Sequence, residues 1–165
     1  MRAQILSINH VTLIVDNLET ATQFYREELG LESLPSLDFD YPVEFFRIND
    51  KQQLHLSEWP DQPSYRGHVC FVSCDFNSLF HRFKSLNCIE VEAWGKVRRL
   101  ADGALQMFAR DPAGNLLEFS APPGYALDPA IEADKDFFQQ DGDVFVSGRN
   151  DARGTRGEGG TLYHK

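Results

Sequence analysis

Three histidines and one glutamate have the types and positions needed to bind a metal ion. His10 and His68 each stand at the start of an apolar stretch, and His55 and Glu118 each interrupt another apolar stretch. Imidazole nitrogens and carboxylate oxygens are good ligands for Zn, Ni, Mn, Co or Fe(II). A carboxylate among apolar neighbours also needs a cation, a metal or hydrogen bonds to offset its burial. These residues therefore predict a divalent-metal site.

Each of these residues also has an ordinary structural explanation when it is taken alone. A histidine in a strand is more often a hydrogen-bonded core or groove residue than a ligand, and a glutamate before a loop is often an edge charge. His55 alone could orient a turn. Two further histidines, His81 on a predicted helix and His164 near the terminus, are expected to be solvated. The metal interpretation therefore depends on how the four positions are related.

An internal repeat relates them. His10-Val11 corresponds to His68-Val69 at an offset of 58 residues, and residues 54–57 correspond to residues 117–120 at an offset of 63. The second correspondence pairs His55 with Glu118. Polar residues that recur at matching places in matching strands indicate a duplicated structural unit.

Each repeat is predicted to fold as a βαβββ unit. β-branched and apolar runs predict strands, helical spacing of apolar residues predicts one helix per unit, and Asn, Asp, Gly and Pro clusters predict turns. In the first unit we expect strands at 8–15, 32–37, 43–48 and 52–57, with a helix at 18–29. In the second we expect strands at 67–72, 89–94, 105–110 and 115–119, with a helix at 76–86.

The predicted fold class is α+β, with two βαβββ modules that form a cupped, mostly antiparallel sheet around one metal site. The modules are residues 1–64 and 65–121, and residues 122–165 form a C-terminal extension that is partly irregular. We expect one acidic helix at 127–138. Residues 147–160 are all small, polar or charged, and such a segment cannot build a core.

Composition limits the classes of function. The chain has 165 residues, of which 42% are hydrophobic, and its apolar runs are far too short to span a membrane. A net charge of −9 argues against nucleic acid as a partner. We find no charged-then-apolar leader and expect a cytoplasmic protein. The cysteines lack metal-site spacing, and Cys70 and Cys74 are expected to be buried free thiols.

The residues around these positions resemble the vicinal oxygen chelate superfamily, which contains glyoxalases, bleomycin-resistance proteins and extradiol dioxygenases. Residues 8–13 with Phe24-Tyr25 and Leu29-Gly30-Leu31 look like its first strand and helix, and Gly67-His68-Val69 looks like the start of its second module. The segment from Asp111-Pro112-Ala113-Gly114-Asn115 to Glu118 is similar to its terminal hairpin, which is the most specific piece. The resemblance covers about residues 5–121.

The resemblance implies a divalent metal that chelates neighbouring oxygens of a small-molecule substrate, in a protein that is commonly a homodimer. By position, His10, His68 and Glu118 match the three ligands of the dioxygenase and fosfomycin-resistance branches. His55 matches the fourth ligand of glyoxalase I, although that ligand is usually a carboxylate or amide. Glu118 and His55 are the catalytic candidates. Three protein ligands favour a dioxygenase-like reaction, and a fourth favours a lyase or isomerase.

Further residues are candidates for the substrate pocket. They are Thr12, Phe46, Arg47, Trp59, Phe108 and Arg110. Thr12 matches a substrate-contacting threonine of the fosfomycin branch, whereas Phe108 stands where that branch has a functional tyrosine. The arginines could bind an anionic substrate or simply be surface residues, and the aromatic residues could equally belong to the core. The alternative function is a metal-free protein that sequesters a small molecule, such as a drug, in the manner of bleomycin-resistance proteins.

Overall fold

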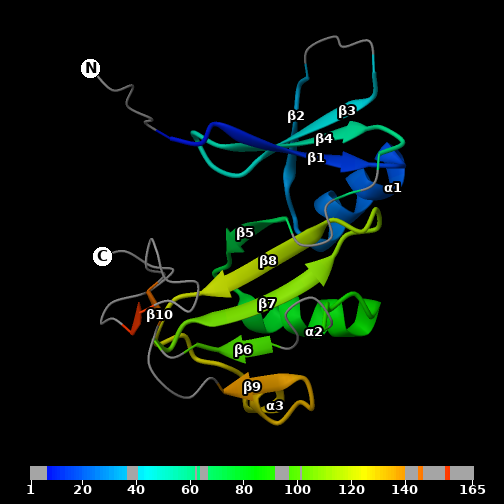
Figure 1. The fold of residues 1–165 in the computed structure, drawn as a ribbon. Coiled ribbons are helices and arrows are strands. Elements are labelled where there is room, and N and C mark those ends of the chain that lie inside the picture. Colours follow the sequence, from blue (N-terminus) through cyan, green and yellow to red (C-terminus); the bar gives the residue numbers. More distant parts are fainter. Residues whose placement is uncertain are drawn as a thin grey trace, which may run out of the picture. The chain divides into compact units, whose positions relative to one another are not determined.

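The computed structural model describes residues 7–36, 41–61, 63, 67–91, 97–100 and 102–139, together with the backbone of residues 145–146 and 155–156. The chain divides into a first unit, residues 1–69 with 110–116, and a second unit, residues 70–109 with 117–165. Each unit is built on a β-sheet and contains a helix of its own (Figure 1). Among the described residues, no helix has the length and apolar character needed to cross a membrane.

The first sheet has four strands in the order β1-β4-β3-β2. Strand β1 (His10–Val15) is parallel to β4 (Gln53–Glu58), whereas β3 (Val43–Arg47) is antiparallel to β4 and to β2 (Glu32–Leu34). Helix α1 (Leu18–Gln23) follows β1 and continues into the π-helical turn η1 (Phe24–Glu28). The predicted βαβββ order of the first module is confirmed.

Local hydrogen bonds explain where the first helix begins and ends. The side chain of Asn17 accepts a hydrogen bond from the backbone N–H of Thr20 (2.8 Å), and Glu58 accepts one from the N–H of Leu18 (2.7 Å). Gly30 follows the helical segment with a φ of 67°, a conformation that glycine adopts without side-chain strain. The start of the helix is therefore tied to the last strand of its own sheet.

The two faces of the first sheet differ. Phe46, Leu54 and Leu56 are at most 1% exposed, and the ring of Phe46 lies 5.9 Å from that of Tyr25 on the helical segment. Because side chains alternate along a strand, the residues between them face the opposite side. His55 is one of these, and its register partner on β1 is Thr12.

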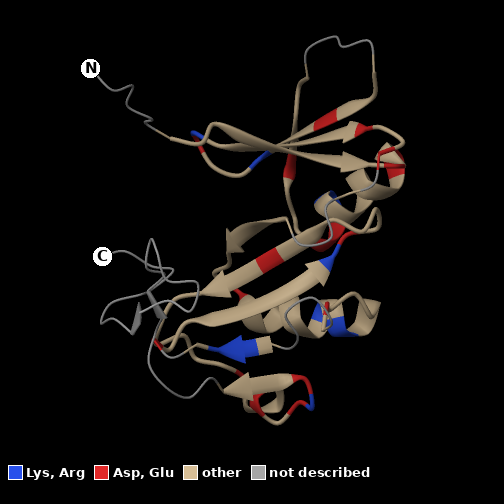
Figure 2. Ribbon diagram, in the orientation of Figure 1, with Lys and Arg blue, Asp and Glu red and all other residues tan. Residues whose placement is uncertain are grey.

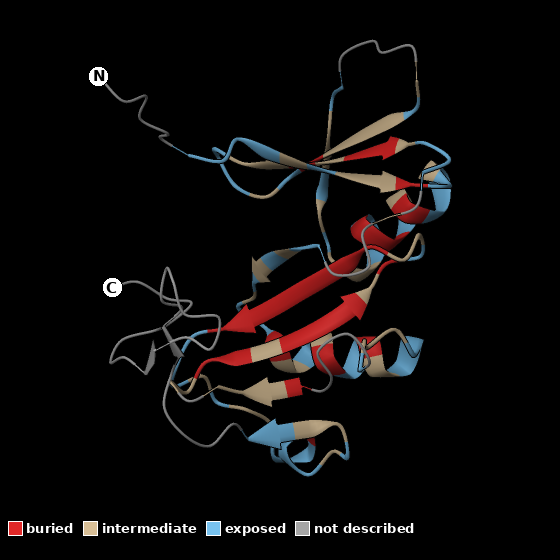
Figure 3. Cartoon of the chain, in the orientation of Figure 1, coloured by how far each residue is buried: buried red, intermediate tan, exposed pale blue. Residues whose placement is uncertain are grey.

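The second sheet has five strands in the order β5-β8-β7-β6-β9. Their bounds are β5 (His68–Val72), β6 (Val97–Arg99), β7 (Leu105–Arg110), β8 (Leu116–Ala121) and β9 (Phe137–Gln139), with helix α2 (Phe76–Leu86) after β5. Strand β8 is buried throughout and β7 along most of its length (Figure 3). Glu118 is the one charged residue in the sequence of β8. Figure 2 shows one acidic segment on this strand.

The second strand predicted for the second module, at 89–94, falls partly outside the described residues. Of the strand expected at 89–94, Ile89 forms an isolated bridge with Ala109, and residues 92–96 are outside the described part of the chain. The strand that pairs with β7 is β6, with Arg98 opposite Gln106. The backbone N–H of Leu100 donates to the carbonyl of Ala104 (2.8 Å), so a tight turn fixes the register of this pair.

The predicted acidic helix at 127–138 is wrong in its extent. Only α3 (Pro129–Glu132) is helical, and the chain then forms β9, which pairs in parallel with β6. The ammonium group of Lys84 on α2 binds both Asp134 (2.8 Å) and Asp136 (2.7 Å). These ion pairs and the edge of β6 hold the segment in a non-helical form.

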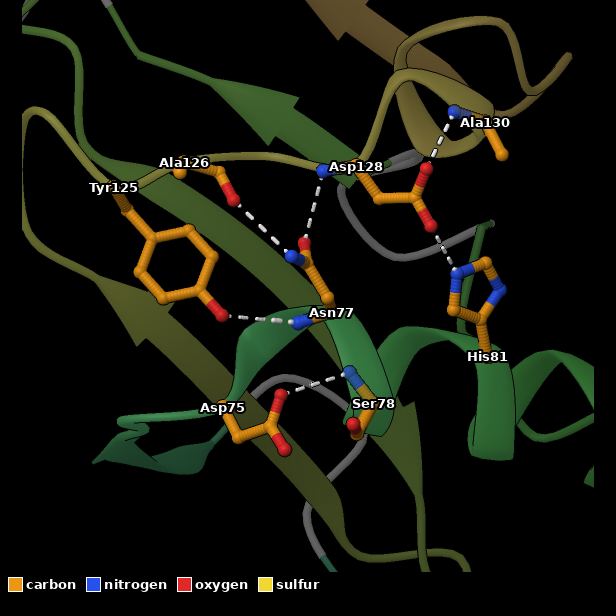
Figure 4. A network of polar contacts seen from close by, with 8 residues as sticks. All are labelled: Asp75, Asn77, Ser78, His81, Tyr125, Ala126, Asp128 and Ala130. Atoms are coloured by element: carbon orange, nitrogen blue, oxygen red, sulfur yellow. Dashed lines mark hydrogen bonds and ion pairs between the residues drawn. The ribbon is translucent and has the colours of Figure 1, made fainter.

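A network of polar contacts fastens the extension to α2 (Figure 4). Asn77 donates from Nδ2 to the carbonyl of Ala126 (3.1 Å) and accepts at Oδ1 from the N–H of Asp128 (3.1 Å). The imidazole of His81 is bound to Asp128 (2.9 Å), and Asp128 also caps α3 at Ala130 (2.9 Å). His81 is exposed, as expected, and it also anchors the extension.

Candidate metal centre

His10 is oriented by the residue before it. Nδ1 of His10 lies 2.9 Å from Oδ1 of Asn9, and because an amide oxygen can only accept, Nδ1 must be the protonated nitrogen. This tautomer leaves the lone pair on Nε2. A hydrogen bond that fixes the tautomer of an imidazole is the usual companion of metal ligation by its other nitrogen.

His55 lies between two other rings. Its centroid is 4.2 Å from that of His10 and 3.6 Å from that of Phe45, with interplanar angles of 12° and 9°. Nε2 of His55 donates to Oε1 of Gln53 over 2.8 Å. Burial lowers the pKa of His55, and nearby His10 lowers it further, so His55 is neutral at pH 7.

Glu118 is 4% exposed and held by neutral polar groups of the second unit. Gln106 on β7 donates from Nε2 to Oε1 of Glu118 over 2.8 Å. The thiol of Cys70 on β5 also bonds to Glu118 and lies 3.4 Å from Oγ of Ser120. Burial raises the pKa of the Cys70 thiol to about 11. The hydrogen bond with Ser120 lowers this pKa, and the nearby Glu118 raises it. The thiol beside Glu118 is therefore protonated.

His68 is the first residue of β5 and is exposed. It lies two residues before Cys70 and therefore on the same face of that strand. Cys70 on the edge strand β5 and Cys74 in the bend after it are both exposed residues, in contrast to the prediction of buried thiols, although the Sγ atom of Cys70 is part-buried beside Ser120. Within the described ranges of the chain, no three His, Cys, Asp or Glu side chains gather into a metal-binding group. The ligand set His10, His68 and Glu118, with or without His55, stays a prediction.

Of the pocket candidates on the first sheet, Thr12 is exposed. Phe46 is 0% exposed and packs against Tyr25, so it belongs to the core of the first unit. The residue that faces the other way is its neighbour Phe45, which contacts His55. Arg47 donates from Nε to a carboxylate oxygen of Glu32 over 2.9 Å on the surface.

The remaining pocket candidates differ in exposure. Trp59 is 42% exposed and lies 5.0 Å from the ring of Tyr41. Phe108 is 3% exposed. Arg110 donates from Nη1 to the carbonyl of Gly114 over 2.9 Å, which makes it part of the hairpin turn. Trp59 is thus the candidate aromatic residue whose ring is open to a ligand.

The residues that sequence reasoning missed are amides. Asn9, Gln53 and Gln106 each hold one of the candidate residues His10, His55 and Glu118. A signal was present in the strand spacing, because Gln53 precedes His55 by two residues and shares its face. Residues 106 and 118 likewise fall on one face of a hairpin that turns at residues 111–115.

The hairpin turn itself is a buried polar structure in the first unit. Asp111 is 4% exposed and accepts hydrogen bonds from Tyr25 Oη (2.8 Å) and from the N–H of Asn115 (2.8 Å). Asn115 also donates from Nδ2 to the carbonyl of Ile14 on β1 (2.8 Å). Burial raises the pKa of Asp111, and the bonds from Asn115 and Tyr25 oppose this. The most specific motif of the sequence therefore supports the fold.

Comparison with known families decides the relationship. The profile of the Glyoxalase/Bleomycin resistance protein/Dioxygenase superfamily matches residues 7–119. The chain belongs to this superfamily. Its members act on small molecules, often form dimers and generally bind divalent metals. No curated protein sequence matches the chain.

Solved structures of superfamily proteins are similar to the chain. A lactoylglutathione lyase from Agrobacterium tumefaciens is 29% identical, with 70% of this chain and 92% of that chain covered and a TM-score of 0.54. A glyoxalase family protein from Bacillus anthracis is 24% identical, with 73% and 98% covered and a TM-score of 0.61. A fosfomycin resistance protein variant from Listeria monocytogenes, complexed with Mn(II) and 1S,2S-dihydroxypropylphosphonic acid, is 21% identical, with 73% and 95% covered and a TM-score of 0.60. The last two support the fold alone.

Proposed function

We propose that the protein is a divalent-metal-dependent enzyme that acts on a small molecule through two neighbouring oxygens, either as a glyoxalase-like lyase or isomerase or as a dioxygenase-like enzyme. His10, His68 and Glu118 are its proposed ligands, and Zn, Ni, Mn, Co and Fe(II) fit two imidazoles and a carboxylate. We further propose a cytoplasmic homodimer, as superfamily members often form dimers.

The observation that carries this proposal is that a side-chain amide orients two of the three proposed ligands. Asn9 fixes the tautomer of His10 with its lone pair on Nε2, and Gln106 donates to Oε1 of Glu118. Such contacts hold ligand atoms in place and raise metal affinity. A bound cation would also offset the free-energy cost of burying the Glu118 carboxylate.

The residues of the site have separable roles in the proposed reaction. A bound divalent cation supplies Lewis-acid polarisation of substrate oxygens. Glu118 brings negative charge into an interior where Gln106 and Cys70 are neutral donors. Thr12 shares the face of His10 and could donate a hydrogen bond to a substrate oxygen. Trp59 offers an exposed ring against an apolar part of the substrate.

Metal removal tests the proposal. The purified full chain is treated with a chelator and dialysed, and Mn, Co, Ni, Zn and Fe(II) are added back in calorimetric titrations. We expect one divalent cation per chain, and turnover of a compound with neighbouring oxygens that is lost on chelation and restored by the metal. Catechols and α-hydroxycarbonyl compounds are suitable probes, because one class reports ring cleavage and the other isomerisation.

The alternative function gives the opposite result. If the protein sequesters a small molecule without metal, ligand affinity is unaffected by chelation, and Glu118→Ala binds the ligand as the wild-type chain does. That outcome, together with the absence of a metal-binding isotherm, would reject the enzyme proposal.

A further inference from the structure

We propose that His55 is a positioning residue that holds the ring of His10, and is not a fourth metal ligand. The inference rests on the proposed function, because it concerns the same metal centre, and it narrows the reaction class. It is carried by the ring stack of Phe45, His55 and His10 within the first unit.

The stack is incompatible with two imidazoles that share one ion. A metal binds an imidazole nitrogen in the plane of the ring, about 2.0–2.1 Å from the nitrogen along its lone pair. The rings of His10 and His55 lie 4.2 Å apart with planes only 12° from parallel. Their in-plane lone pairs therefore lie in nearly parallel planes that do not meet at this range. An ion in the plane of His10 lies outside the plane of His55.

Two further contacts keep the ring of His55 in this orientation. Strand β4 lies between β1 and β3, so His55 is flanked by His10 on one side and by its register partner Phe45 on the other. Nε2 of His55 is also engaged with Gln53. Turning His55 toward an ion would break this hydrogen bond and both stacks. Each contact keeps the ring flat against His10.

The consequence for chemistry is a metal held by three protein groups. Two histidines and one carboxylate leave coordination positions open for both oxygens of a chelating substrate and for one further small ligand, as in oxygenase sites. A fourth protein ligand would fill one of those positions. The stack therefore favours the dioxygenase-like branch of the proposed function.

Two substitutions of His55 distinguish a residue that supports the ring of His10 from a residue that binds the metal. His55→Phe keeps a flat ring between Phe45 and His10 but removes both nitrogens, whereas His55→Ala removes the ring as well. If His55 supports His10, we expect metal affinity of His55→Phe within about 3-fold of wild type, and a loss of about 10–100-fold in His55→Ala, the range typical of an outer-shell residue. Calorimetry on the full chain with Co(II) or Zn measures the metal affinity of both variants.

His81→Phe is the matched control. His81 binds Asp128 in the second unit, so we expect this variant to keep the wild-type metal affinity.

Two spectroscopic readouts complete the test. Pulsed electron paramagnetic resonance of the Cu(II)-loaded chain counts coordinated imidazoles, and we expect two in wild type and in His55→Phe. Without metal, NMR of the His10 ring should show ring-current shifts that His55→Phe retains and His55→Ala loses.

Three results would overturn the inference. Equal and large losses of affinity in both variants, or a third imidazole in the wild-type signal, would make His55 a ligand and leave the proposed metal function intact. His10 resonances that neither variant alters would show that no stack exists. Absence of metal binding by the wild-type chain would instead remove the proposed function, and the positioning role with it.

Discussion

The last strands of the two βαβββ modules place different residues at corresponding positions. His55 in β4 is half-buried between two rings, whereas Glu118 in β8 is 4% exposed and held by an amide and a thiol. Both strands carry their polar residue between apolar neighbours, as the repeat predicts. The comparison teaches that the same place in a strand does not give a side chain the same chemistry, because its neighbours decide its chemistry.

The largest effect expected from this comparison belongs to Glu118→Gln. The substitution keeps the size of the side chain and an acceptor for Gln106, but it removes the charge. We expect metal affinity to fall by more than about 100-fold, beyond the range of a residue that only supports a ligand. Calorimetric titration of the variant measures this. Metal binding at the wild-type level would remove Glu118 from the site and weaken the contrast with His55.

The next effect compares the two amides. Gln106→Leu leaves Oε1 of Glu118 without its donor, and we expect metal affinity to fall by about 10–100-fold with the metal-free fold intact. Gln53→Leu is the matched change beside His55, and it should lower affinity less than about 10-fold, because His55 contacts the proposed ligand His10 through its ring. Both are measured by metal titration, with circular dichroism to check folding. Equal losses in the two variants would contradict the different roles assigned to His55 and Glu118.

A third effect concerns stability and compares one tyrosine of each unit. Tyr25→Phe removes one of the two hydrogen bonds to Oδ2 of buried Asp111 and leaves the one from Asn115, and the loss of a hydrogen bond to a buried carboxylate costs about 1.5–3 kcal/mol of unfolding free energy. Tyr125→Phe removes an acceptor from the N–H of Asn77, a longer contact of 3.4 Å that is only part-buried, and should cost less than about 1 kcal/mol. Urea unfolding gives both values. A larger loss for Tyr125→Phe would show that the turn at 111–115 is not the tighter structure.

The smallest effect is a pH dependence with opposite signs in the two units. The N–H of Ala130, and then His81, hold the pKa of Asp128 below 3.8, so its stabilising contribution is present above pH 3.8 and lost as pH falls through the lowered value. Burial raises the pKa of Asp111 above 3.8, so its contribution rises as pH falls toward 3.8. Hydrogen exchange, corrected for intrinsic rates, should show the extension near α3 losing protection below about pH 4 before the turn at 111–115. In Asp128→Asn this pH dependence should disappear; if it persists unchanged, another group is responsible.

Much of the fold could be predicted from local signals. Helix α2 has the predicted bounds because Asp75 caps its first turn and Asn87, with a φ of 53°, ends it. The helix expected at 127–138 was wrong in its extent, because the last part of this segment forms β9 and pairs with β6. This short strand pairs with β7 on one side and with β9 on the other, and neither pairing leaves a pattern in the local sequence.

The site was only partly predictable for a similar reason. Period-two alternation shows that Phe45 and Phe46 face opposite sides of β3, but two adjacent aromatic residues do not reveal which of them faces the helix. The structure places Phe46 against Tyr25 and Phe45 against His55. The ring stack depends on the parallel pairing of β1 with β4, which joins segments more than 40 residues apart in the chain. A list of histidines therefore could not show that the rings of His10 and His55 stack on one another.

The turn at 111–115 also has a consequence for how the chain folds during synthesis. Residues 110–116 belong to the first unit, yet they are translated only after residues 70–109 of the second. Until they leave the ribosome, the hydroxyl of Tyr25 and the carbonyl of Ile14 lack the partners that Asp111 and Asn115 provide. The amino-terminal unit therefore cannot complete its interior when its own 69 residues have emerged, and its last contacts close a loop of 86 residues or more. Nascent chains arrested before residue 110 would present an unfinished first unit to chaperones and proteases.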